Sequence, residues 1–274
     1  MKWYLQSLGK RKIIELIVLI VFMIFFVGPL LNLVLLAFSG KWQYPALYPE
    51  IWSFKWWEFV FSNSNLSRSM ILSFEFAPIV TFLSIIICVP AAYAFARIKF
   101  PFRQWFLFSF LLTNAFPKMG LYVSIAVLFY KFGLMDTFVG VILIQLVNTL
   151  MFMTWIPASA FRSVHKAQEE AAHDAGANGL KVFFSVTLPM ALPGILVASI
   201  FAFLASLDEA QGTLMVGTPD FITMPVIMYS LVTDYPGTAG AVFSILLTLP
   251  SIILLLVARR FLGSNAMANG FQMK

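Results

Sequence analysis

Charged residues are scarce in this sequence, and their scarcity excludes an ordinary soluble domain. Asp, Glu, Lys and Arg make up 11% of the 274 residues, whereas soluble domains contain about 25%. The single cysteine, Cys88, excludes an intrachain disulfide framework and a site made of several cysteines. His165 and His173 have no recognised metal-ligand spacing, and no Gly-x-x-x-x-Gly-Lys-Ser/Thr loop occurs. We therefore predict that the chain binds no metal and does not itself hydrolyse ATP.

Apolar residues are abundant instead. They make up 61% of the chain, with 30 phenylalanines and 7 tryptophans, and the mean hydropathy is +0.90. A run of about 20 apolar residues can cross a bilayer as a helix. We expect the first run to stay in the protein, because it is too long for a signal peptide and no small-x-small cleavage site follows it. The sequence predicts an all-α integral membrane protein with six transmembrane helices, at 13–36, 69–96, 104–130, 137–160, 188–207 and 239–257.

Lysine and arginine indicate the orientation of these spans. Thirteen of them lie before the first span, in the second and fourth connections, or after the last span, against four on the opposite side. Cytoplasmic segments of membrane proteins carry this excess. We predict a basic cytoplasmic N-terminus at 1–12, a transmembrane domain at 13–261 and a cytoplasmic tail at 262–274. The asymmetry accounts for the net charge of +6, so no nucleic-acid partner is expected.

A polar island between the fourth and fifth spans contains the most specific motif. Its frame is Glu170-Ala171-Ala172, then Gly176, then Val186-x-Leu188-Pro189. This frame resembles the EAA loop of the permease subunits of bacterial ABC importers, except that Val186 replaces the usual isoleucine. The resemblance implies a short coupling helix in the cytoplasmic loop 162–188, opened by the Glu-Ala-Ala triplet and redirected at Gly176. The residues implied to contact an ATPase are Glu169, Glu170, Ala171, Ala172, Asp174, Gly176, Leu188 and Pro189.

The same resemblance implies the partners of the chain. They are a second permease subunit, identical or homologous, two ATPase subunits, and an extracytoplasmic substrate-binding protein, all at a bacterial cell membrane. ATP and Mg belong to the ATPase subunits, so no cofactor is expected on this chain. The outer loops 40–68 and 211–237 are either docking and gating elements or plain interfacial packing. We predict a short interfacial helix within 52–61, and a turn at 217–220 followed by an apolar piece at 224–232.

Polar residues inside the spans are the candidates for lining a translocation pathway. A charged group at membrane depth is costly and usually faces a cavity or a partner. Asn114 and Lys118 are four residues apart, which places them on one face of a continuous helix, although Pro117 can bend it. Lys118 either pairs with Glu75 or lines a cavity beside Asn114. The other candidates, which could equally hold helices together or face water, are Gln145, Asn148, Asp208 and Glu209.

The substrate is the least determined property. Asp174-Ala175-Gly176, the segment 193–209 and Thr223-Met224-Pro225 resemble the polyamine, iron and phosphonate branch of these permeases, whereas 128–137 and the tail after Arg260 resemble the sugar branch. We expect a polyamine or organic-ion substrate, with a sugar, oligosaccharide or polyol as the alternative. Two readings from other classes are a non-transporting membrane scaffold and an intramembrane enzyme; neither requires the Glu-Ala-Ala frame.

Overall fold

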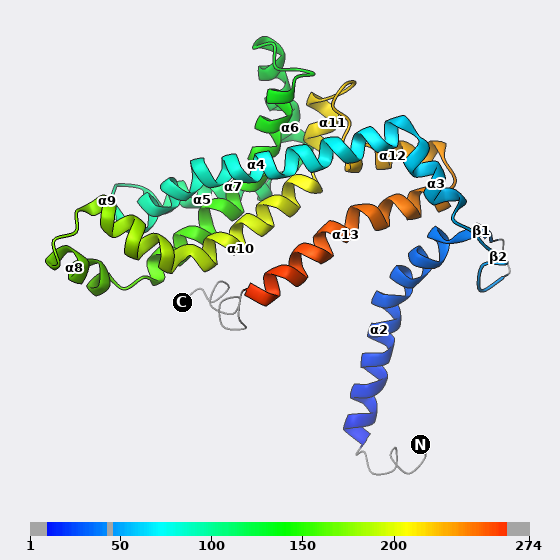
Figure 1. Ribbon diagram of the computed structural model, residues 1–274, viewed down its shortest axis with the longest axis horizontal. Coiled ribbons are helices and arrows are strands. Elements are labelled where there is room, and N and C mark those ends of the chain that lie inside the picture. The colour runs from blue at the N-terminus through cyan, green and yellow to red at the C-terminus, as the bar shows by residue number, and fades with distance from the viewer. Residues whose placement is uncertain (1–9, 43–45, 262–274) are drawn as a thin grey trace. The chain divides into compact units, whose positions relative to one another are not determined.

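The computed structural model describes residues 10–42 and 46–261, so the predicted tail 262–274 and most of the basic N-terminus lie outside the described residues. The predicted all-α fold is confirmed (Figure 1). The chain divides into two compact units. One comprises Met1–Asn63 and Ser230–Leu246, and the other comprises Ser64–Tyr229 and Leu247–Lys274.

The first unit contains the first span and the outer loop that follows it. Its elements are α2 (Lys10–Ala37), the antiparallel strands β1 (Ser39–Lys41) and β2 (Ile51–Trp52), and α3 (Lys55–Ser62). The predicted interfacial helix is therefore shorter than expected, because Trp52 pairs in the hairpin instead. Trp57 of α3 donates its indole N–H to the carbonyl of Ala37, at 3.0 Å, and stacks on Phe38. These contacts fix α3 to the end of α2.

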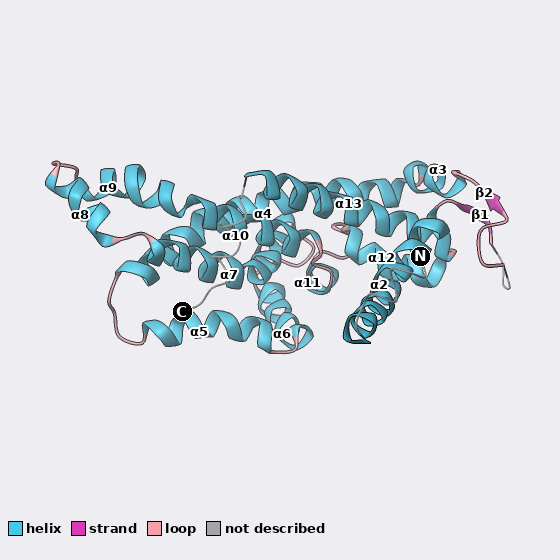
Figure 2. Ribbon diagram, turned by 90° about the horizontal axis from the view of Figure 1, so that it is seen from below, coloured by secondary structure: helices cyan, strands magenta, loops and turns pink. Residues whose placement is uncertain are grey.

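The second unit contains the remaining spans and the polar island. Its core is formed where α4, α7 and α10 pack on one another, side by side in Figures 1 and 2. Its elements are α4 (Ser64–Arg97), α5 (Arg103–Ala115), α6 (Lys118–Lys131), α7 (Phe138–Ser163), α8 (Lys166–Asp174), α9 (Gly179–Val182), the π-helix η1 (Phe183–Thr187), α10 (Leu188–Leu207) and α11 (Gln211–Val216). Two further helices, α12 (Met224–Asp234) and α13 (Gly237–Phe261), are shared between the units.

Small residues allow α7 and α10 to approach closely. A Cβ atom placed on Gly194 of α10 would lie 2.4 Å from the Cβ of Ala160 on α7, so no larger residue fits there without separating the helices. Ala92 of α4 and Ala198 of α10 are buried in the same cluster. Close packing of small residues is the usual way in which transmembrane helices associate, since lipid is as apolar as the helices themselves.

Five helices are long and apolar enough to cross a membrane, and the predicted third span is a bent pair. Helices α5 and α6 form an angle of 103° at Phe116-Pro117, and Figure 2 shows α6 turning away from α5. Pro117 has no N–H to continue the ladder of α5, and it restricts Phe116 to an extended backbone (ψ 151°). The prediction of one continuous helix over 104–130 is therefore wrong.

Candidate functional site

Helix α8 (Lys166–Asp174) contains the Glu-Ala-Ala triplet. The helix starts at Lys166 because His165 before it has an extended backbone. The triplet therefore lies in the middle of α8, not in its opening turn as predicted, and Glu169 lies in the first turn instead. An acidic side chain there is favoured by the positive end of the helix dipole. No side chain of α8 is buried, so the helix presents a polar surface.

Gly176 ends α8 in a left-handed conformation with φ +86°, which confirms the predicted redirection of the chain. Its N–H bonds the carbonyl of His173, and the N–H of Ala177 bonds the carbonyl of Ala172. These two bonds define a Schellman motif, in which glycine is preferred because a Cβ atom is disfavoured at positive φ. Asn178 then caps α9 by accepting a hydrogen bond from the N–H of Lys181.

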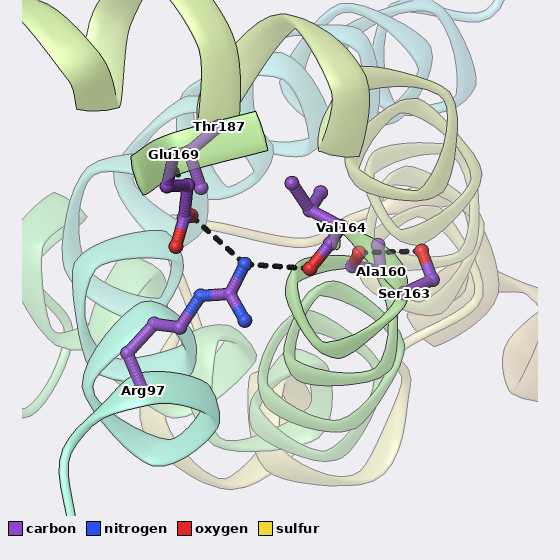
Figure 3. A network of polar contacts seen from close by, with 6 residues as sticks. All are labelled: Arg97, Ala160, Ser163, Val164, Glu169 and Thr187. Carbon is purple, nitrogen blue, oxygen red and sulfur yellow. Dashed lines mark hydrogen bonds and ion pairs between the residues drawn. The ribbon is translucent and has the colours of Figure 1, made fainter. Parts of the chain in front are cut away.

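An ion pair attaches α8 to the end of α4 (Figure 3). Arg97 donates to the Oε1 of Glu169 at 2.8 Å and to the carbonyl of Val164 at 2.9 Å. Thr187 of η1 donates to the same Oε1 at 2.7 Å. The Arg97 and Glu169 side chains are only 12% and 16% exposed. Three segments far apart in sequence therefore meet at one carboxylate, and α8 is held in a fixed place.

The two adjacent glutamates of α8 have different environments. Glu169 is half-buried and bonded within the chain, whereas Glu170 is exposed. Ala171 and Gly176 are exposed beside Glu170, and Ala172 is partly exposed. The structure therefore separates the predicted contact residues of this loop: Glu169 anchors the helix, whereas Glu170, Ala171, Ala172, Asp174 and Gly176 lie on a surface that a second protein can reach. Arg97 and Thr187 were missed as anchors, because only the fold brings them near Glu169.

Leu188 and Pro189 lie inside a continuous helical stretch rather than at its beginning. The span runs from Gly179 to Leu207 and includes η1, so it starts nine residues before the predicted 188. The N–H of Leu188 bonds the carbonyl of Phe183, five residues back. Pro189 has no N–H to donate. In a regular α-helix its ring would also clash with the carbonyl one turn earlier. A π-helical turn next to Pro189 accommodates this defect. Leu188 and Pro189 thus shape the entry into α10.

A cavity of about 770 Å³ lies in the second unit and contains most of the predicted pathway residues. Its lining combines polar groups with aromatic rings. The stacked rings of Phe152 and Phe201, with centroids 5.5 Å apart, line the cavity, and so does Tyr229. These rings were missed, because in an apolar span an aromatic residue usually contacts lipid or the core. The polar lining residues are Asn114, Lys118, Asn148, Asp208, Glu209, Gln211, Thr248 and Ser251.

Lys118 is held in this cavity by an amide. Its Nζ donates to the Oδ1 of Asn148 at 2.9 Å, and Asn148 donates to the carbonyl of Ala205 at 2.8 Å. Among the described residues, Lys118 forms no ion pair with Glu75, which is exposed on α4. Of the two predicted roles of Lys118, pairing with Glu75 is therefore wrong. The kink at Pro117 also means that Asn114 and Lys118 belong to different helices, although they face the same cavity.

Asp208 lies one residue beyond α10 and lines the cavity near Lys118. Burial raises the pKa of its carboxyl, and the positive charge of Lys118 acts in the opposite direction. The cavity lining therefore contains one cationic side chain, Lys118, and two acidic ones, Asp208 and Glu209, besides its amides and rings. Such a surface offers hydrogen-bond donors and acceptors to a neutral polar molecule.

Gln145 does not line this cavity. It is fully buried, accepts from Ser206 at 2.6 Å and donates to Thr213 at 3.1 Å. Thr213 donates in turn to Glu209, which also accepts from the backbone N–H of Gly212 and Thr213. Glu209 is 4% exposed and stabilises the start of α11, although it also lines the cavity. These residues therefore hold α7, α10 and α11 together.

Replacing Gln145 with leucine is expected to destabilise the protein without altering substrate selectivity. The change leaves Ser206 and Thr213 without their shared partner, and an unsatisfied buried polar group costs about 1–3 kcal/mol. Thermal unfolding of the purified protein in detergent measures this loss. Gln168→Leu, on the exposed surface of α8, is the matched control and should unfold as the parent does. A changed preference among transported solutes in Gln145→Leu would instead place this residue in the pathway.

No cluster of three or more metal-ligating side chains occurs among the described residues.

The chain is similar to known proteins over most of its length. Residues 84–265 match the family model described as "Binding-protein-dependent transport system inner membrane component".

The similarity to individual relatives extends beyond residues 84–265. The trehalose transport system permease protein SugB of Mycobacterium tuberculosis is 27% identical over 219 residues, which cover 78% of this chain and 80% of SugB. The maltose/maltodextrin transport system permease protein MalG of Vibrio vulnificus is 26% identical over 287 residues, which cover 97% of each chain. A solved bacterial ABC transporter involved in import of the acidic polysaccharide alginate has a TM-score of 0.72 at 19% identity, covering 92% of this chain and 96% of that one. At 19% identity, the similarity to the alginate transporter shows a shared fold.

Proposed function

This chain belongs to the family of binding-protein-dependent transport system inner membrane components and is a permease subunit of an ABC importer, and we propose that it forms one half of a pore for a sugar or oligosaccharide. The observation that carries the proposed substrate class is the cavity, whose lining combines two stacked rings with amide and charged groups. Sugars have apolar ring faces and polar edges, and ligand sites combine an apolar wall with a few placed polar groups.

The relatives favour the same substrate class. SugB is named for trehalose, and MalG for maltose and maltodextrin. The expected polyamine, iron or phosphonate branch is not supported by these relatives, and the sugar alternative replaces it. The short motifs near Gly176 and Pro225 therefore do not determine the substrate branch.

The energy for transport comes, in this proposal, from ATPase subunits that carry ATP and Mg and bind the exposed surface of α8. Glu170, Ala171, Ala172, Asp174 and Gly176 form the contact. Alanine and glycine allow a second protein to approach the backbone closely. This role places α8 and both termini in the cytoplasm of a bacterial cell. The remaining partners are a second permease subunit and an extracytoplasmic binding protein that delivers the sugar to the opposite side.

The proposal is tested by reconstituting the chain with its ATPase, second permease and binding protein in lipid vesicles. Trehalose or maltotriose is expected to stimulate ATP hydrolysis and to accumulate inside the vesicles, whereas spermidine should do neither. Stimulation and uptake of spermidine without any response to the sugars would reject the proposed substrate class. No uptake of any solute, with an intact assembled complex, would argue for a scaffold instead.

Replacing Lys118 with methionine is expected to lower uptake at limiting substrate by about one to two orders of magnitude, with the protein still folded. A hydrogen bond to a charged group contributes about 1.5–3 kcal/mol, and in the proposed pathway Lys118, which Asn148 holds in the cavity, donates such a bond to the substrate. Initial uptake rates in the same vesicles measure the effect. Lys131→Met, at the other end of α6 and exposed, is the matched control. Equal uptake by both variants would remove Lys118 from the pathway.

A further inference from the structure

A second cavity lies between the start of α5 and the end of α7, and the transport pathway proposed above does not use it. Its volume is about 530 Å³. Two arginines and two tryptophans define it: Arg103 and Trp105 come from α5, and Trp155 and Arg162 come from α7. The indole N–H of Trp155 donates to the carbonyl of Leu107 at 2.9 Å, which fixes this wall to α5.

Both arginines lack a counter-charge within the described part of the chain. Neither forms an ion pair or a hydrogen bond there, and no carboxylate lines the cavity. The charge of Arg103 acts directly on Arg162, so the two guanidinium groups repel each other. Arg97, by contrast, is neutralised by Glu169. Two neighbouring guanidinium groups with free donors are suited to an oxyanion, which they can bind in a bidentate manner.

The surroundings of the cavity are those of a lipid-facing surface. Trp105 is 71% exposed, and Phe106 and Phe108 beside it on α5 are 55% and 48% exposed. Tryptophan concentrates at the membrane–water boundary, where its apolar ring and its N–H are both accommodated. A neighbouring cavity of about 470 Å³ adds Lys99 to Arg103 and Trp105. Basic groups and exposed rings are thus combined at one end of the helices.

We infer that this cavity binds the phosphate headgroup of an anionic phospholipid, with the acyl chains lying along the exposed aromatic face of α5. The inference rests on the proposed orientation, which puts these arginines at the cytoplasmic leaflet. Anionic lipids are recognised there by basic pockets between helices. An acidic surface of an ATPase subunit would also suit two arginines. The lipid is favoured because the exposed side chains that follow Arg103 on α5 are apolar rings, which lipid covers and water does not.

The full chain is purified in detergent, stripped of lipid and incubated with phosphatidylglycerol, phosphatidylcholine or inorganic phosphate. Native mass spectrometry then measures how much of each remains bound. Wild-type protein should retain phosphatidylglycerol in preference to phosphatidylcholine. The double variant Arg103→Gln with Arg162→Gln should retain at least about tenfold less phosphatidylglycerol. The matched control is Arg68→Gln with Lys131→Gln, which removes two exposed charges outside the cavity and should bind like the wild type.

Three results would overturn the inference. Unchanged phosphatidylglycerol retention in the double variant removes the arginines from lipid binding. Displacement of the lipid by millimolar inorganic phosphate identifies a site for a free anion. Loss of ATPase association in the variant, at unchanged lipid retention, assigns the surface to a protein partner. If the double variant does not fold, the single variants decide, because each should lose part of the retention. Lipid retention is measured without transport, so failure here leaves the proposed importer function standing.

Discussion

Replacing Glu169 with alanine is expected to abolish transport and to destabilise the loop that carries α8. The change leaves the largely buried Arg97 without a counter-charge and removes the acceptor of Thr187. Breaking one partner of a buried ion pair costs about 3–5 kcal/mol, and the small remaining exposure of both side chains places the expected cost near the lower end. Limited proteolysis of the 162–188 loop and uptake in vesicles measure the two effects.

A second pair of variants separates the charge from the packing. Arg97→Met combined with Glu169→Met removes both charges and keeps apolar volume, and replacing both partners is often close to neutral. We expect the double variant to resist proteolysis almost as the parent does, whereas either single change does not. Glu170→Ala, one residue along α8, is the matched control and should leave the loop intact. A double variant as sensitive to proteolysis as Glu169→Ala would mean that the ion pair does not hold α8.

The spans were predictable because length and hydropathy decide whether a segment crosses a bilayer. Helices α4, α7 and α13 include almost all of the predicted ranges 69–96, 137–160 and 239–257. The bend between α5 and α6 was harder to predict. Pro117 suggests a kink, but hydropathy is continuous through 104–130, and helix packing determines whether a proline bends a helix slightly or breaks it.

The site was predictable where a motif is local and unpredictable where the partner is distant. Gly176 was correctly expected to redirect the chain, because the requirement for positive φ is a property of one residue. The partner of Lys118 was not, since Asn148 lies 30 residues away and only tertiary packing brings it near. The partners of Gln145, which are Ser206 and Thr213, were hidden from the sequence for the same reason. A polar residue in an apolar run indicates a partner, but the sequence does not say whether that partner is a substrate or another helix.

Reversing the charge of Glu170 is expected to eliminate transport while leaving the folded protein unchanged, whereas a change at Glu169 also destabilises the loop. Glu170 is exposed on α8, and exposed substitutions usually alter stability by no more than about 0.5 kcal/mol. In the proposed complex its carboxylate is covered by the ATPase. Removing one partner of a buried charge pair at an interface costs about 2–5 kcal/mol. Glu170→Lys should therefore weaken ATPase association by about 30-fold or more.

Association is measured by titrating the purified ATPase onto the permease in lipid nanodiscs, and thermal unfolding of the permease is followed in parallel. Glu58→Lys, the same reversal at an exposed position of α3, is the matched control and should bind the ATPase with the parental affinity. Parental affinity in Glu170→Lys would exclude the exposed face of α8 as the ATPase contact. Weaker association together with a lower unfolding temperature would instead mean that Glu170 acts on the loop as Glu169 does. Only loss of association at unchanged stability assigns the two neighbouring carboxylates to different tasks, one within the chain and one between subunits.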